Sequence, residues 1–150
     1  MLTSTQKILA RARDKGYAVG AFNVYNLEGA LAVVRAASEL KSPVILQVLP
    51  SALILGGSAL IHLCLEAGRS APVPVAVHLD HCPSKTDIQK ALDAGISSVM
   101  ADGSMLEFED NLNFTREMSG LATRALAGVE GELGRITGKE DGMTAHDLEA

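Results

Sequence analysis

The sequence predicts an α/β fold in which parallel strands alternate with helices. Short aliphatic runs alternate along the chain with longer segments that have helical periodicity. Hydrophobic residues make up 47% of the 150 residues but aromatic residues only 3%, so the core has to be built from aliphatic side chains. Aliphatic strands of this kind are typical of a parallel sheet that is covered by helices.

The expected elements follow one another in a regular order, beginning with a helix over residues 3–15 that Gly16 ends. Five strands are expected, and they cover residues 18–24, 42–49, 73–80, 97–102 and 128–133. The helices between them are expected at residues 26–41, 57–69 (with Ser58 as N-cap), 84–95 and 108–128. The polar segment 134–150 is expected to be a loop that leads into another helix.

The bulk composition disfavours several classes of partner. The net charge is −5 and no basic stripe is present, so a nucleic-acid partner is not expected. The longest apolar segment, residues 51–68, is interrupted by Gly56 and Gly57 and carries His62, so no membrane span is expected. The two cysteines, Cys64 and Cys82, match no metal or disulfide spacing. We therefore expect a cytoplasmic protein with reduced thiols.

Two architectures are compatible with repeated β–α units. A doubly wound sheet, as in a nucleotide-binding module, needs a glycine-rich phosphate loop after the first strand, and residues 21–29 lack one. Part of a (β/α)8 barrel instead predicts polar functional residues at the C-terminal ends of several strands. Such residues occur after four of the expected strands, at Asn23, Asp80–His81, Asp102 and Glu132. The sequence therefore favours a partial TIM barrel of about five strands with intervening helices and an N-terminal helix.

The residues at these strand ends could form a metal site with an adjacent proton-transfer group. His81, Asp102 and Glu132 offer nitrogen and oxygen ligands, a set that suits a divalent transition ion, above all zinc. Asp80 and His81 can share this site only if the strand already turns there, and Pro83 favours such a turn. The alternative is that His81 is a surface turn residue and Asp102 a helix N-cap. His78 is expected to have a packed, hydrogen-bonded role.

Three motifs in order, "HLDH" at 78–81, "MADGS" at 100–104 and "VEGELGRITGKEDG" at 129–142, resemble those of one enzyme family. This family is the class II, zinc-dependent ketose-bisphosphate aldolases, which act on fructose or tagatose bisphosphate. The segment 21–47 also resembles the family's N-terminal region, so the resemblance covers essentially the whole chain. It implies an aldehyde-lyase of carbohydrate metabolism and glycolysis that cleaves fructose 1,6-bisphosphate into dihydroxyacetone phosphate and glyceraldehyde 3-phosphate.

The resemblance implies roles for individual residues. His81 matches a ligand of the catalytic zinc, while Asp102 and Glu132 match ligands of a second, more buried metal position. No lysine lies within an expected strand, which independently argues against the alternative Schiff-base route of aldol cleavage.

The remaining matched residues concern the substrate. Asp80 matches the general acid/base at the C4 hydroxyl, and Asn23 matches a substrate-side amide. Glu140 matches a loop residue suspected of proton transfer. The resemblance further implies a homo-oligomer with a small sugar bisphosphate as substrate.

Two features depart from the family pattern. Leu49 stands where many relatives carry Ser or Thr, and Ser51 could supply the hydroxyl group that the leucine lacks. The family's two further histidine ligands and its glycine-rich phosphate loop have no counterpart in the sequence. We therefore expect residues 1–150 to be the N-terminal portion of a single TIM-barrel aldolase domain, marginally stable or self-associating and inactive alone. The alternative is a non-catalytic truncated homologue that acts as an oligomerising or interaction protein.

Overall fold

The structure, a computed structural model, describes residues 1–134, 138–140 and 143–145. Its helices are α1 (Thr5–Lys15), α2 (Leu27–Glu39), α3 (Pro50–Ser70), α4 (Lys85–Asp93) and α5 (Phe108–Arg124). The main sheet contains β1 (Gly20–Asn23), β2 (Val44–Val48), β3 (Val75–Cys82), β4 (Ser98–Ala101) and β5 (Gly128–Gly131). These strands and helices confirm the expected alternation.

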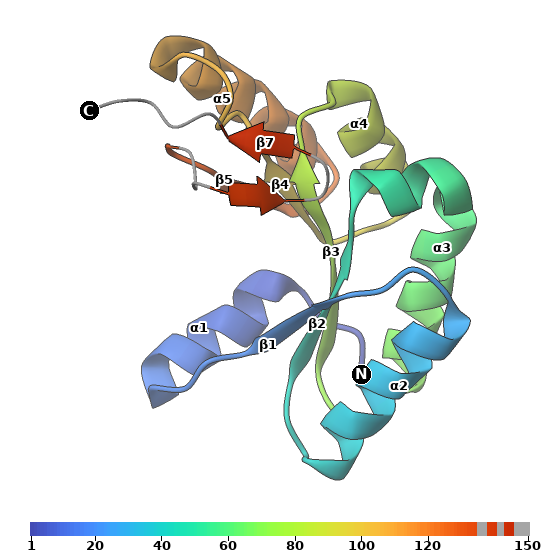
Figure 1. Cartoon of the computed structure of the whole chain (residues 1–150). Helices are drawn as coiled ribbons and strands as arrows, with labels where there is room; N and C mark the ends of the chain where they lie inside the picture. Colours follow the sequence, from blue (N-terminus) through green and yellow to red (C-terminus); the bar gives the residue numbers. More distant parts are fainter. Residues whose placement is uncertain (135–137, 141–142, 146–150) are drawn as a thin grey trace.

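The order of the strands decides between the two architectures. All neighbouring strands are parallel, and the sheet runs β1-β2-β3-β4-β5 in the order of the sequence. A doubly wound sheet reverses its strand order at a switch point, and its helices cover both faces. Here α2, α3 and α4 lie together on one side of the sheet, and α1 lies on the opposite side (Figure 1). The sheet is therefore an open, barrel-like arrangement with an outer, helix-covered face and an inner face.

The two faces of the sheet carry different side chains. On β3, Val75, Val77 and Leu79 join the large core cluster with residues of α3 and α4 on the outer face. The alternating residues point to the inner face, as the period of two in a strand requires. Ala76 packs there against Ile8 of α1. The next inner-face residues along β3, His78 and Asp80, are both buried and polar. The inner face thus changes from apolar at the α1 end to polar at the carboxyl end of β3.

The helix α3 differs from the expectation at its start. It begins at Pro50 with Leu49 as N-cap, whereas the sequence predicted a start near Ser58. The chain is kinked at Gly57, whose φ of 55° and ψ of −157° are not helical. A glycine tolerates this conformation at low cost, so the helical turn before the kink is joined to the main helix. The expected interruption at the glycine pair is therefore a kink within one longer element.

The helix α3 is also the one helix in the described part of the chain that is long and apolar enough to cross a membrane. The sequence predicted no such segment. However, α3 contacts β2, β3, α2 and α4, and its buried residues include Leu60, Ile61, Cys64 and Leu65. A core helix of a soluble domain passes the same length and composition test, so this observation is weak evidence for a membrane role.

The segment after β5 also differs from the expectation of a loop. Two short strands, β6 (Gly138–Glu140) and β7 (Met143–Ala145), pair in an antiparallel sheet that is separate from the main sheet. The helix expected further on would begin in residues 146–150, which lie outside the described residues.

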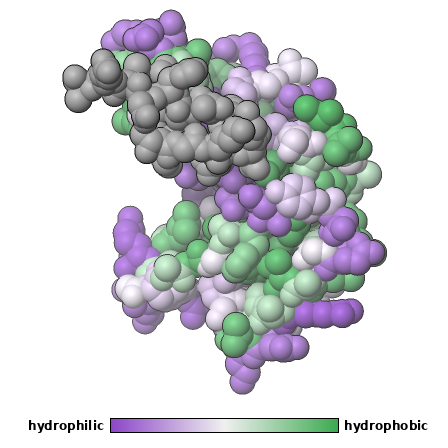
Figure 2. All heavy atoms as spheres, viewed as in Figure 1, coloured by the Kyte–Doolittle hydropathy of each residue, from purple (hydrophilic) through white to green (hydrophobic). Residues whose placement is uncertain are grey.

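The edge strand β1 borders an apolar groove on the molecule. All four residues of β1 are exposed, and Phe22 is 51% exposed. The groove lies between α1 and α2 and has a volume of about 1110 Å³. Its lining includes apolar residues such as Phe22 and Leu40 and the basic residues Lys7, Arg11, Lys15 and Lys41. Figure 2 shows hydrophobic side chains exposed in the lower part of this view, where β1, β2 and α1 lie in Figure 1. An edge strand with an apolar surround is a template for pairing with another chain.

We predict that the 150-residue chain self-associates through the β1 edge and that Phe22→Lys weakens this association. A lysine on an edge strand opposes strand addition because its charge would have to be buried. Sedimentation velocity at increasing protein concentration measures the effect. Leu55→Lys is the matched control, because Leu55 is 91% exposed on α3 and does not line the groove. A wild-type chain that stays monomeric at every concentration contradicts the prediction.

Candidate active site

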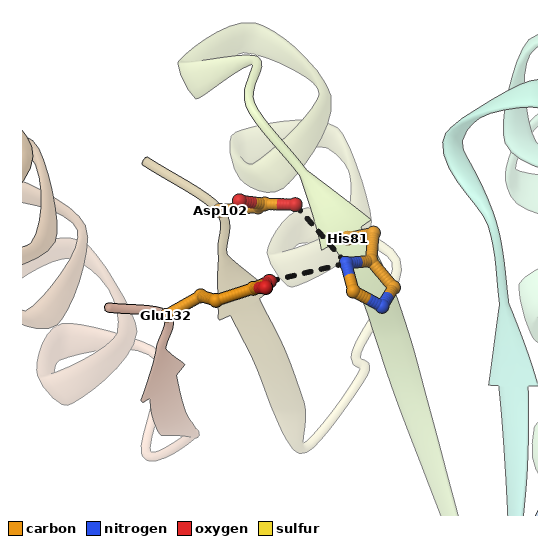
Figure 3. Close-up of side chains that lie close together, drawn as sticks. All are labelled: His81, Asp102 and Glu132. Carbon is orange, nitrogen blue, oxygen red and sulfur yellow. Dashed lines mark hydrogen bonds and ion pairs between the residues drawn. The ribbon is translucent and has the colours of Figure 1, made fainter. Parts of the chain in front are cut away.

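Three side chains from successive strand ends converge at the carboxyl edge of the sheet. His81 lies on β3, Asp102 directly follows β4, and Glu132 directly follows β5. The Nδ1 atom of His81 is 3.0 Å from Oδ2 of Asp102 and 3.3 Å from Oε2 of Glu132 (Figure 3). One ligand atom from each residue lies within 4.8 Å of the others. The three residues that the sequence singled out as metal ligands are therefore brought together.

A local irregularity of β3 places His81 in this group. His81 has a φ of 45°, in the left-handed region that residues other than glycine seldom adopt. The register between β3 and β4 shifts between Leu79 and Cys82, and the amide of Asp102 donates to the Cys82 carbonyl at 3.1 Å. The strand therefore turns at His81, as the sequence required for Asp80 and His81 to serve one site. Strained backbone of this kind is often found at functional sites.

The carboxylate of Asp102 is held by hydrogen bonds at both oxygens. Oδ1 accepts from the backbone amide of Ser104 at 3.0 Å, and Oδ2 faces His81. Burial acts to raise the pKa of Asp102, but the hydrogen bonds from Ser104 and His81 outweigh it and lower the pKa below its usual value. Asp102 is therefore ionised at neutral pH. The N-cap of α5 is Glu107, so the alternative role of Asp102 as a helix cap is wrong.

The position of Glu132 depends on a residue that the sequence did not single out. Asn111 of α5 is 5% exposed, and its Nδ2 donates to the Glu132 carbonyl at 2.7 Å. The hydroxyl of Thr115 donates to Oδ1 of Asn111 at 3.2 Å. Gly103 lies so close that an added Cβ would sit 2.2 Å from the same oxygen. An asparagine within a helix gives no local signal of such a role, because its partner lies 21 residues away.

Asp80 is buried beside the converging residues and close to a second histidine. Asp80 is 7% exposed and His78 is 2% exposed. The Nε2 atom of His78 is 3.7 Å from Oδ1 of Asp80, and its Nδ1 lies 2.8 Å from Oγ of Ser98 on β4. Burial, together with the charge of His81, lowers the pKa of His78 to about 4. His78 is thus packed and hydrogen-bonded, as expected, and Asp80 lies on the inner face with it.

The remaining expected residues lie further from this group or outside the described side chains. Asn23 ends β1 and is in register with Gln47 of β2, which is in register with His78. Asn23 is therefore on the same face of the sheet, two strands away, and exposed. Leu49 is 2% exposed at the start of α3. The backbone of Glu140 lies in β6, but its side chain lies outside the described part.

Comparison with known proteins identifies relatives over the whole chain. The profile of the "Fructose-bisphosphate aldolase class-II" family matches residues 3–149. Fructose-bisphosphate aldolase of Thermus caldophilus is 43% identical over 100% of this chain and 49% of its own length. D-tagatose-1,6-bisphosphate aldolase subunit GatY of Klebsiella oxytoca is 40% identical over 97% of this chain and 52% of its own. Sulfofructosephosphate aldolase of Alkalicoccus urumqiensis is 38% identical over 98% of this chain and 52% of its own length.

Solved structures agree with these relatives. A crystal structure assigned as a fructose-1,6-biphosphate aldolase of Coccidioides immitis superposes with a TM-score of 0.89 at 37% identity, over 93% of this chain and 50% of that one. The YdjI aldolase of Escherichia coli K12 gives a TM-score of 0.83 at 34% identity, over 89% of this chain and 51% of that one. The chain thus spans about half the length of the relatives it matches. Its open sheet corresponds to half of a TIM barrel.

We predict that Asn111→Ala lowers the free energy of unfolding by about 1–3 kcal/mol, because the Glu132 carbonyl loses its buried donor. Urea denaturation followed by circular dichroism measures the change. Asn113→Ala on the same helix is the control, since Asn113 is exposed and accepts a hydrogen bond from exposed Arg116. We expect the control to stay within about 0.5 kcal/mol of wild type. Equal losses in both variants contradict the role given to Asn111.

Proposed function

Because the chain belongs to the class II fructose-bisphosphate aldolase family, we propose that it supplies part of the active site of a zinc-dependent aldolase. The proposed reaction is cleavage of a ketose 1,6-bisphosphate, foremost fructose 1,6-bisphosphate, into dihydroxyacetone phosphate and glyceraldehyde 3-phosphate. The convergence of His81, Asp102 and Glu132 beside the buried Asp80 is the observation that carries this proposal.

The chemistry of the donor set fits a zinc ion. His81 offers an imidazole nitrogen, and Asp102 and Glu132 offer carboxylate oxygens, all within 4.8 Å. The lowered pKa of Asp102 keeps one of these donors anionic at neutral pH. We propose that His81 holds the catalytic zinc and that Asp102 and Glu132 serve a second, more buried metal position. When bound, zinc supplies a Lewis acid for the negative charge that aldol cleavage develops.

We propose that Asp80 is the general acid/base. In cleavage it takes the proton of the C4 hydroxyl as the C3–C4 bond breaks, and in condensation it returns that proton to the new alkoxide. Its burial on the inner face, next to His81, supports this role because it shields the proton transfer from bulk water. Asn23 is proposed to contact the substrate as an amide donor or acceptor, and Glu140, whose backbone lies in β6, to take part in proton transfer.

The names of the relatives support a phosphorylated ketose as the proposed substrate class. Proteins similar to this chain are named for fructose bisphosphate, tagatose bisphosphate and sulfofructosephosphate. Fructose and tagatose differ at C4, the carbon whose hydroxyl Asp80 would handle. We propose a cytoplasmic, homo-oligomeric enzyme of carbohydrate metabolism and glycolysis. In this proposal residues 1–150 form the N-terminal portion of a single barrel domain.

A second function, a non-catalytic homologue that associates with another chain, is favoured by one observation. In the described residues β1 and β5 are the edges of an open sheet. In this alternative the strand edges and the apolar groove beside β1 bind a partner, and the metal centre is only partly assembled.

We predict that the chain binds Zn²⁺ and that His81→Ala and Asp102→Asn each weaken the binding at least about tenfold, since each removes a donor. Isothermal titration calorimetry with ZnCl₂ measures the affinity. His62→Ala is the matched control, because His62 is exposed on α3 and its Nδ1 hydrogen-bonds to the Ser58 carbonyl of the same helix. A wild-type affinity that neither site variant changes contradicts the proposed ligands.

We predict that cleavage of fructose 1,6-bisphosphate, where it is present, is abolished by EDTA and falls by about 10²–10⁴-fold in Asp80→Asn, because the variant cannot accept the proton. A coupled assay that detects glyceraldehyde 3-phosphate measures the rate. Asp93→Asn serves as control, since Asp93 is exposed at the end of α4. Wild-type protein that binds zinc but shows no cleavage favours the non-catalytic alternative.

A further inference from the structure

A second group of polar side chains lies on the inner face beside the proposed metal centre. It consists of His78 and Asp80 on β3, Ser98 on β4 and Glu130 on β5. The Nε2 atom of His78 lies 3.7 Å from Oδ1 of Asp80 and 3.6 Å from Oε2 of Glu130. In the described part of the chain this buried Nε2 has no hydrogen-bond partner within bonding distance. A buried ring nitrogen is thus directed between two carboxyl groups.

The parallel register explains why these residues meet. His78 is in register with Ser98, and Ser98 is in register with Gly128. Glu130 stands two residues beyond Gly128 and Asp80 two residues beyond His78, so all four side chains share the inner face. The arrangement is therefore built into the sheet and does not depend on a loop.

The chemistry of the ring selects one tautomer. With a pKa lowered to about 4, His78 is neutral at pH 7 and carries one N–H. If Nδ1 carried the hydrogen, the lone pair of Nε2 would face the oxygens of Asp80 and Glu130, which is repulsive when these are ionised. If Ser98 instead donates its hydroxyl hydrogen to Nδ1, over 2.8 Å, the N–H of Nε2 points at the carboxyl groups. The second arrangement satisfies both ring nitrogens.

We propose that His78 is a positioning residue for Asp80: Ser98 holds the ring as the Nε2–H tautomer, and that N–H orients the Asp80 carboxylate for proton transfer. This inference rests on the proposed acid/base role of Asp80. A movement of about 0.8 Å brings the pair to the ordinary N–H···O distance of about 2.9 Å, and such bonds often tighten only when substrate is bound. The Nε2 proton stays on the His78 ring throughout. Glu130, whose side chain is 60% exposed, is a competing acceptor for the same N–H.

The first test reads the tautomer and needs no activity. Long-range ¹H–¹⁵N spectra of the ¹⁵N-histidine-labelled 150-residue chain at pH 7 should show His78 as a neutral Nε2–H ring. Ser98→Ala should populate the Nδ1–H form, because the donor to Nδ1 is lost. Asp80→Asn should shift the Nε2–H proton resonance, whereas Glu130→Gln should leave it near the wild-type position. An Nδ1–H ring in wild type, or a resonance that moves only in Glu130→Gln, overturns the proposal.

The second test distinguishes the effect of losing the Nε2–H donor from the effect of losing the volume of the imidazole ring. A glutamine side chain can place an N–H near the position of Nε2, whereas asparagine is too short to do so. His78→Asn should lower kcat about tenfold with little change in KM, since the donor that orients the Asp80 carboxylate is lost. His78→Gln should restore most of kcat, and His62→Asn is the control. Equal losses in His78→Asn and His78→Gln overturn the proposal.

The two tests distinguish failure of this inference from failure of the proposed function. If the wild-type chain neither binds Zn²⁺ nor cleaves the sugar bisphosphate, the proposed function fails for this chain. The tautomer of His78 and its response to Asp80→Asn then decide the positioning role by themselves.

Discussion

The break in the β3 ladder at His81 is the constraint on which the site depends. In a regular strand, Asp80 and His81 would point to opposite faces of the sheet, one to the inner face and one into the helix-side core. The left-handed backbone at His81 turns the chain so that both residues serve the same edge. A residue in this conformation costs on the order of 1–3 kcal/mol. The contacts of His81 with Asp102 and Glu132, and the ladder that resumes at Cys82, hold it there.

Residues that do not touch the proposed metal position hold the side chains of the site in place through hydrogen bonds. Asn111 of α5 ties the Glu132 backbone, and the Ser104 amide ties the Asp102 carboxylate. Ser98 holds the ring of His78. Ligands need such support, because metal affinity and proton transfer are both sensitive to displacements of less than 1 Å. The geometry of the side chains at the strand ends therefore depends on the packing of α5 and on the register of β3 with β4.

The inner face of the sheet is apolar at one end of the strands and polar at the other. At the α1 end, Ile8, Ile45 and Ala76 form a buried apolar cluster. Towards the carboxyl end, the same face carries His78, Asp80 and Glu130. Because the strands run parallel and in sequence order, all their carboxyl ends meet at one edge, where polar groups can gather without disrupting the core on the other face. The open edges at β1 and β5 leave this arrangement incomplete as a barrel in the described residues.

The sequence by itself determined the α/β alternation, the five strands and the three residues of the converging group, because aliphatic runs and polar residues at their ends are local signals. It also indicated that β3 had to turn before Pro83. It missed Asn111, the join of α3 across Gly57 and the β6–β7 pair, and left the choice between barrel and doubly wound sheet to motif arguments. Only the tertiary structure decided the strand order, the register of His78 with Ser98 and the contact of Asn111 with Glu132, because these depend on contacts between residues about twenty or more positions apart.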